Sequence, residues 1–198
     1  MSLLKTVTGK LILANFIVFI INILFKNSID YLALTPTDAL YKGMIWQFLT
    51  FMYVHAGIEH ILLNMWGLFM FGPTIEYAMG KKKFFLFYMV TGISSGIFHI
   101  LLTGISNTPL VGASGAIFGV MTAYGLMFPR QTIYFQLIIP MPAIVFIILI
   151  GLLQIVYGIT GLEPGISNYG HLGGMIIGFI LVKYLGFEKR KIRFFWEQ

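Results

Sequence analysis

Six long apolar stretches constrain what this 198-residue chain can fold into. A bilayer core about 30 Å thick requires about 20 apolar residues for each helix that crosses it. Only 10% of the residues are charged and 58% are hydrophobic, whereas soluble chains are about 25% charged. We therefore expect an all-α membrane protein, a single six-helix domain over residues 1–198 with no soluble domain attached. The expected spans are 11–25, 58–78, 84–103, 114–128, 141–160 and 168–185.

Composition also limits partners and cofactors. The chain has no cysteine, which excludes disulfides and thiolate zinc sites. The first apolar stretch lacks a small-residue cleavage site before Lys26, so it is interpreted as a retained helix rather than a signal peptide. The net charge of +6 would indicate nucleic acid only if the basic residues formed a patch, but they lie at the ends of the stretches. Nucleic acid is not an expected partner.

The basic residues predict an orientation in the membrane. With six spans, only Lys26 and Lys42 fall on one side and the other eleven of the 13 fall on the opposite side. Cytoplasmic loops carry an excess of lysine and arginine, so both termini should be cytoplasmic. The external loops are then 26–57, 104–113 and 161–167. The eleven are Lys5, Lys10, Lys81, Lys82, Lys83, Arg130, Lys183, Lys189, Arg190, Lys191 and Arg193.

The fourth stretch is too short to cross the apolar core unaided. Residues 114–128 would form about 22 Å of helix. Its external end must therefore begin below the membrane surface, and irregular backbone at that depth is tolerated only beside a protein cavity or water. We expect Ser114 at the bottom of a wet pocket that opens to the outside. The loop 26–57 is semi-apolar and should form a structured interfacial element, and residues 133–142 should form an interfacial turn on the cytoplasmic side.

Ser114 lies in the sequence Gly112-Ala113-Ser114-Gly115. One interpretation is helix packing, because small residues let membrane helices approach closely and Gly115 and Gly119 form a GxxxG pattern. The other is a serine nucleophile at a helix start, where free amide N–H groups could hold an oxyanion. The glycines would let a substrate backbone come close.

His171 precedes a second glycine pattern, formed by Gly174 and Gly178. A polar helix contact or a transport-pathway ligand are the alternatives, but an ionisable residue within a membrane is functional by default. The two glycines share a helix face, which would let the sixth helix press against the glycines of the fourth. That contact could bring His171 to hydrogen-bonding distance of Ser114. Phe118, one turn below Ser114, is placed to pack against the imidazole.

Further histidines and an asparagine lie near the same expected membrane face. His60 and Asn64 are spaced to share one side of the second helix. They could make an interhelical hydrogen bond. Alternatively, they could be side-chain donors that form an oxyanion hole together with the backbone N–H of Ser114. His55 lies in the preceding turn and is interpreted as structural. His99 stands in the third stretch without a partner motif and is interpreted as packing.

A carboxylate third member of a triad is missing. Glu59 would point away from the Asn64 face, Glu76 lies toward the cytoplasmic end, and Glu163 lies in a loop. We therefore expect a Ser–His dyad whose imidazole is oriented by packing and neutral hydrogen bonds, with Asn168 as one candidate. Without a carboxylate to stabilise the imidazolium, a slower enzyme is expected.

These motifs, in this order, resemble those of the rhomboid intramembrane serine proteases. The resemblance covers nearly the whole six-helix core. It is carried by His55-x4-His60-x3-Asn64, by Gly112-Ala113-Ser114-Gly115, by His171-x2-Gly174-x3-Gly178, and by Gly72-Pro-Thr-Ile-Glu76-x3-Gly80 at the exit of the second stretch.

The resemblance implies a dyad of Ser114 as nucleophile and His171 as general base, with an oxyanion hole from His60, Asn64 and the Ser114 amide. It also implies cleavage of transmembrane proteins after a small residue, in or near segments that unwind easily, without a metal or other cofactor. Two positions depart from the family pattern. The long first loop has Trp46-Gln47 instead of Trp-Arg, so it should be anchored differently. Phe118 stands where the family often has tyrosine.

Two other classes of protein remain as alternatives. A rhomboid-like protein that binds membrane clients without cutting them usually lacks the serine or the histidine, and this chain keeps both. A transporter or channel would place polar groups through the whole bilayer depth, often with inverted repeats, whereas here they cluster near one face. The absence of a transit peptide favours a multi-pass protein of a prokaryotic plasma membrane. The sequence does not indicate an oligomeric state.

Overall fold

The computed structural model describes residues 5–135, 138–163 and 165–184. All six apolar stretches form long helices, and the largest difference from the expected bounds is at the first. That helix begins at Val7 instead of residue 11, because the Thr6 side chain caps it by accepting a hydrogen bond from the Gly9 amide at 2.9 Å. The six are α1 (Val7–Leu24), α5 (Ile58–Met79), α6 (Lys81–Thr103), α7 (Ser114–Met127), α8 (Ala143–Thr160) and α9 (Asn168–Tyr184).

Three of these helices, α1, α6 and α8, are long and apolar enough to cross a membrane. Helix α7 is apolar but has only 14 residues, about 21 Å of helix. Its length agrees with the expectation that the fourth stretch is too short to cross an apolar core of about 30 Å alone. Ser114 therefore begins the shortest of the six long helices.

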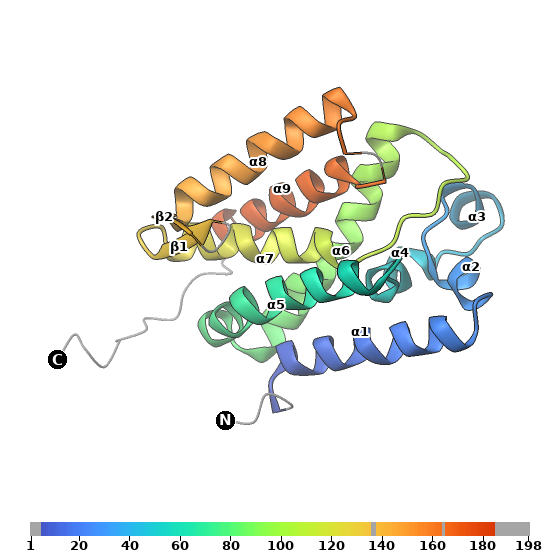
Figure 1. Ribbon diagram of the computed structural model, residues 1–198, viewed down its shortest axis with the longest axis horizontal. Coiled ribbons are helices and arrows are strands. Elements are labelled where there is room, and N and C mark those ends of the chain that lie inside the picture. Colours follow the sequence, from blue (N-terminus) through green and yellow to red (C-terminus); the bar gives the residue numbers. More distant parts are fainter. Residues whose placement is uncertain (1–4, 136–137, 164, 185–198) are drawn as a thin grey trace.

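The long helices alternate in direction, so α5, α7 and α9 all begin at one end of the bundle (Figure 1). Short helices α2 (Ser28–Leu32), α3 (Pro36–Tyr41) and α4 (Gln47–Thr50) lie near that end. The start of α1 and the end of α9 lie at the opposite end (Figure 1). This arrangement brings the first residues of α5, α7 and α9 together, although they are far apart in the sequence.

Helix α7 occupies the centre of the bundle. It contacts α5, α6, α8 and α9, and nine of its 14 residues are buried. Helices α1 and α8 are peripheral, with five and four buried residues out of 18 each. Their exposed side chains are mainly aliphatic, as at Ile20 and Leu152. Such faces suit contact with lipid, because the hydrocarbon core accepts apolar surface without cost.

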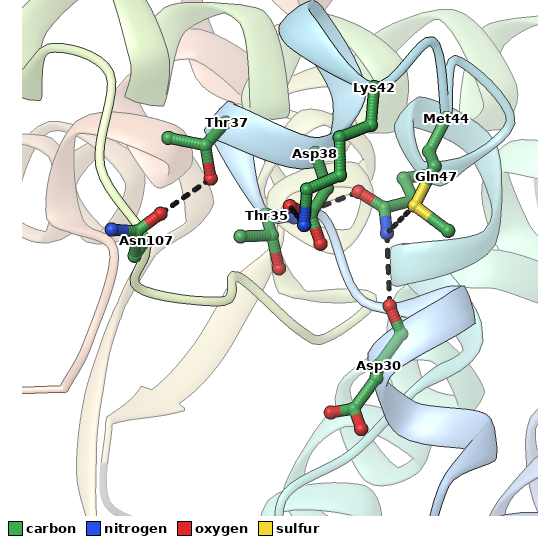
Figure 2. A network of polar contacts seen from close by, with 8 residues as sticks. All are labelled: Asp30, Thr35, Thr37, Asp38, Lys42, Met44, Gln47 and Asn107. Carbon is green, nitrogen blue, oxygen red and sulfur yellow. Dashed lines mark hydrogen bonds and ion pairs between the residues drawn. The ribbon is translucent and has the colours of Figure 1, made fainter.

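The segment between α1 and α5 is structured, as expected, and it is anchored by a buried glutamine. Gln47 is completely buried. Its Nε2 donates to the Asp30 carbonyl and its Oε1 accepts from the Thr35 amide, both at 3.1 Å (Figure 2). Short helices α2 to α4 are followed by the 3-10 helix η2 (Phe51–Tyr53). The neutral amide at position 47 thus ties this segment together by hydrogen bonds to the backbone.

The same segment holds the loop that leads to Ser114. Leu34 and Leu110 form an isolated antiparallel bridge, with backbone N–H···O distances of 3.0 and 2.8 Å. The Thr37 hydroxyl donates to Asn107 Oδ1 at 2.7 Å (Figure 2). The loop that precedes α7 is therefore held in place by contacts with the segment between α1 and α5.

The connection between α7 and α8, where an interfacial turn was expected over residues 133–142, contains two paired strands that form a β-hairpin. Strands β1 (Thr132–Phe135) and β2 (Ile139–Pro142) pair antiparallel, with Thr132 opposite Pro142. Threonine, isoleucine and aromatic side chains favour extended backbone. Prolines lack an N–H donor and are found at sheet edges, which agrees with a sheet of only two strands.

The C-terminal part of α5 holds the first turn of α1 through Glu76. This carboxylate is 5% exposed. Its Oε1 accepts from the Val7 amide, and its Oε2 accepts from the amide and the hydroxyl of Thr8, each at 2.8 Å. A negative charge at a helix start compensates the unpaired N–H groups and the helix dipole. Glu76 thus caps a helix that precedes it by about 70 residues.

Replacing Glu76 with glutamine should destabilise the bundle. The substitution removes the charge and replaces one of the two acceptor oxygens with an NH2 group, leaving a buried N–H or O–H unpaired. We expect a loss of about 1–3 kcal/mol, measured as a lower thermal unfolding midpoint in detergent. Glu59→Gln changes an exposed glutamate in the first turn of the same helix; it breaks no buried hydrogen bond and should lower the midpoint much less, because an exposed charge at a helix start contributes only about 0.3–1 kcal/mol. Equal midpoints for both variants would contradict a capping role.

Candidate active site

Ser114 and His171 meet at the starts of their helices. A hydrogen bond of 2.7 Å joins Ser114 Oγ to His171 Nε2. Ser114 is the first residue of α7, and His171 lies in the first turn of α9. The histidine is 8% exposed. A serine and an imidazole at this distance have the geometry of a nucleophile and its general base.

Glycines allow the approach that makes this hydrogen bond. A Cβ at Gly174 would collide with the carbonyl oxygen of Gly115, and one at Gly178 would lie 2.9 Å from the carbonyl oxygen of Gly119. Helices α7 and α9 therefore touch backbone to backbone along two turns. Small residues permit such contacts between membrane helices. The glycine faces place His171 beside Ser114.

Phe118 lies against the imidazole. Its ring is one turn below Ser114 and stacks on His171 with centroids 4.2 Å apart and planes inclined by 8°. Parallel stacking at this distance limits the tilt of the histidine ring. The phenyl group has no hydroxyl, so this contact contributes shape and no hydrogen bond.

The second nitrogen of the imidazole has a partner that the sequence interpretation missed. His171 Nδ1 lies 2.8 Å from Oε1 of Gln154 on α8, and both residues are buried. The expectation that Asn168 would orient the ring was wrong, because its side chain turns to the Ile166 carbonyl at 3.5 Å. One signal was available: Gln154 is an amide within the long apolar stretch 141–160, where an unpaired polar group is costly.

One of the predicted oxyanion donors, His60, lies close to Ser114. The Ala56 amide donates to His60 Nδ1 at 3.4 Å, which leaves Nε2 as the protonated nitrogen of a neutral ring. A Cβ at Gly112 would lie 2.8 Å from His60 Nε2 and 3.7 Å from Ser114 Oγ. Gly112 has a φ of +119°, a conformation that favours glycine. His60 and Ser114 thus border the same small space.

The start of α7 adds backbone donors, while Asn64 is turned along its own helix. No side chain caps α7 at Ala113, so the first-turn amides face the space beside Ser114 without a capping acceptor. Asn64 Nδ2 donates to the His60 carbonyl at 2.8 Å. The structure thus brings His60 close to Ser114, whereas the Asn64 amide is hydrogen-bonded to the backbone of its own helix.

His55 supports His60 from the turn before α5. The two rings make an edge-to-face contact with centroids 5.0 Å apart. His55 is 2% exposed, and neither ring nitrogen has a hydrogen-bond partner among the described residues. Burial, followed by the neighbouring His60, lowers the pKa of His55 to about 4, and the nearby Tyr53 backbone offsets this only in part. His55 is therefore a neutral packing residue at neutral pH.

His99 is hydrogen-bonded, which corrects the expectation that it only packs. Its Nδ1 lies 2.7 Å from Ser167 Oγ, and Ser167 also accepts from the Gly170 amide at 3.1 Å. Ser167 thereby caps α9 and joins its start to α6. A small cavity beside Ser114 is bordered by Ser95, Ser167 and His171 among others. The sequence did not reveal this hydrogen bond, because 68 positions separate His99 from Ser167.

Within residues 5–135, 138–163 and 165–184, no three His, Asp or Glu side chains are grouped closely enough to bind a metal ion. The polar groups beside Ser114 are instead the imidazoles of His171 and His60 and the backbone N–H groups at the start of α7. Such a set can activate a hydroxyl and stabilise an oxyanion.

The motifs and the fold agree with comparisons to known proteins. The rhomboid domain model matches residues 42–187, and the chain belongs to the rhomboid family. It is therefore a helical membrane protein of that family, with apolar helices that suit a bilayer.

Relatives occur in plants and bacteria. The chain is 34% identical to RHOMBOID-like protein 1 of Arabidopsis thaliana, over 75% of this chain and 36% of that protein. It is also 34% identical to Rhomboid protease GluP of Bacillus subtilis (strain 168), over 75% of this chain and 27% of that protein. The putative rhomboid protease YdcA of the same bacterium is 32% identical, over 77% of this chain and 73% of that protein. The chain thus spans about a third of the first two relatives.

A methyl group at Gly174 should separate the two residues of the site. The Gly174→Ala side chain would meet the Gly115 backbone, which cannot move aside as a flexible side chain can. We expect a lower unfolding midpoint and loss of the Ser114–His171 contact, measured by thermal unfolding and by fluorophosphonate labelling. Gly57→Ala is the matched control, because a Cβ there meets no atom within 4 Å. Wild-type labelling of Gly174→Ala would contradict the role of this contact.

Acidification should destabilise the protein partly through His55. Its pKa is about 4 in the fold and 6.5 without burial, so the unfolded chain binds more protons between these values. The contribution of neutral His55 to the free energy of unfolding is therefore fully present above about pH 6.5 and is lost as the pH drops toward 4. We expect the unfolding midpoint to fall between pH 7 and pH 5, and to fall less in His55→Gln. An equal decrease in both proteins would show that other groups carry the effect.

Proposed function

We propose that this protein is an intramembrane serine endopeptidase that cuts transmembrane segments of other membrane proteins with a Ser114–His171 dyad. The 2.7 Å hydrogen bond between Ser114 Oγ and His171 Nε2 carries the proposal. Ser114 attacks the scissile carbonyl while His171 accepts its proton. The imidazolium then protonates the leaving amine, and water from the cavity hydrolyses the acyl-enzyme by the same route.

The oxyanion formed during attack would be held by donors beside Ser114. These are the Ser114 amide at the uncapped start of α7 and His60 Nε2 across the space at Gly112, and Asn64 would contribute its amide group or support His60. Removing one such donor costs about a hundred- to a thousand-fold in other serine proteases. Gly112, Gly115, Gly174 and Gly178 keep the space open and the helices close. Phe118 and His55 hold the two imidazoles. No cofactor takes part in these steps.

In the membrane, residues 1–198 would form one multi-pass domain with six spans and both termini in the cytoplasm. The predominance of lysine and arginine at one end supports this orientation. The site then opens to the external side. We propose a prokaryotic plasma membrane as the location, although two relatives from Arabidopsis thaliana are named as mitochondrial.

Transmembrane substrates would enter between α5 and α8. These two helices meet through the stacked rings of Phe71 and Phe146, with centroids 6.4 Å apart. Phe146 lies near the beginning of α8, far from the end that carries the site (Figure 1). Helix α8 can therefore lean away at its outer end. A segment that leaves its helix in lipid has unpaired backbone groups, so substrates with weak helices should be preferred.

The dyad makes a direct prediction for fluorophosphonate labelling and for cleavage of a single-span substrate in proteoliposomes. Ser114→Ala and His171→Ala should abolish both, without lowering the unfolding midpoint below that of the wild type by more than a few degrees. Ser106→Ala, a serine of the external loop, is the control and should keep both.

Two outcomes would contradict the proposal. Cleavage that survives Ser114→Ala would remove the serine from the reaction. A folded wild-type protein that neither labels nor cuts would instead support a rhomboid-like protein that binds clients without cutting them.

A further inference from the structure

Gln154 on α8 has no role in the dyad described above, yet it contacts the proposed base. We propose that Gln154 is a positioning residue: it holds the proton of His171 on Nδ1, so that the lone pair of Nε2 faces Ser114. This inference rests on the proposed serine protease function. It adds a third member to the dyad, supplied by a peripheral helix and neutral in charge.

The placement of Gln154 supports a specific role. Helix α8 is almost entirely apolar, and its residues at 152 and 155 are exposed while Gln154 is 7% exposed. A buried amide costs free energy unless it is hydrogen-bonded. The Oε1 atom of Gln154 meets that requirement at His171 Nδ1, 2.8 Å away. The Gln154 side chain thus faces the imidazole of His171.

The chemistry of the two groups fixes the direction of the hydrogen bond. A neutral imidazole has one N–H donor and one acceptor nitrogen. A serine that gives up its proton needs an acceptor at Nε2, so Nδ1 must carry the hydrogen and Gln154 Oε1 must accept it. The same bond remains when His171 becomes an imidazolium, because Nδ1 keeps its hydrogen. The amide oxygen of Gln154 therefore accepts the same hydrogen bond from Nδ1 before and after the proton transfer from Ser114.

Gln154 and Phe118 restrict the imidazole in different ways. Phe118 stacks on its face, with planes inclined by 8°, and limits tilting. This contact is equally compatible with a ring turned by 180° about its Cβ–Cγ bond, and it does not distinguish the two nitrogens. The hydrogen bond from Nδ1 to Gln154 disfavours the turned ring and selects the tautomer. Together they direct Nε2 at Ser114 Oγ.

A purely structural role would be to satisfy a buried amide. To separate this structural role from the positioning role, we compare Gln154→Leu with Gln154→Glu. The glutamate keeps an oxygen acceptor on a side chain of the same length. Thr122→Val is the matched control: it removes another buried hydrogen-bonding group, whose hydroxyl donates to the Phe118 carbonyl of its own helix at 2.9 Å. Unfolding midpoints of all variants report packing.

For cleavage of a single-span substrate in proteoliposomes, Gln154→Leu should lower kcat by about 10- to 100-fold with little change in KM, since one hydrogen bond to a charged group is lost. Gln154→Glu should recover part of the rate, and the acidic limb of its pH–rate profile should move to higher pH because a carboxylate favours the imidazolium. Thr122→Val should keep the wild-type kcat. An unchanged kcat in a folded Gln154→Leu would overturn the proposal.

A second readout does not depend on activity. In protein labelled with ¹⁵N-histidine, the His171 signals, assigned by their loss in His171→Ala, report which nitrogen carries the hydrogen. We expect Nδ1–H in the wild type and a shift toward Nε2–H in Gln154→Leu. Nε2–H in the wild type would overturn the proposal even if no variant folds. Absence of Ser114-dependent cleavage with Nδ1–H present would reject the protease function and leave the positioning contact intact.

Discussion

The contact between α7 and α9 is the constraint on which the site depends. In lipid no hydrophobic force draws helices together, and close packing of small residues takes its place. Gly174 and Gly178 lie against the backbone of Gly115 and Gly119. This contact leaves no room for side chains between the helices. It sets the separation of their first turns, and with it the distance between Ser114 and His171.

A small number of buried polar side chains fixes the remaining geometry. Glu76 holds the start of α1, Gln47 ties together the segment before α5, and Ser167 joins the start of α9 to His99 on α6. Each bond reaches backbone or side-chain groups that would otherwise be unpaired in an apolar environment. The cost of leaving such groups unpaired gives each connection a single favoured arrangement. The position of Ser114 thus depends on loops as well as helices.

The sequence predicts the features that rest on local spacing. Apolar stretches located the long helices to within a few residues, and the glycine patterns indicated which helix faces meet. Features that depend on a distant partner were missed. Gln154 and His99 each bond a residue in another element, and no local pattern identifies that residue. The hairpin was also missed, since a short apolar run of extended residues resembles an interfacial turn until its two strands are seen to pair.

The position of Gln154 on α8 has a mechanical consequence under the proposed function. Helix α8 is peripheral, and only four of its 18 residues are buried. In the proposed entry route it is also the helix that leans outward to admit a substrate. Because it carries the partner of His171 Nδ1, outward movement of α8 stretches the bond that orients the base. A substrate that holds the helix open without filling the site would leave the imidazole free to rotate. Substrate entry and alignment of the base are therefore linked through one amide side chain.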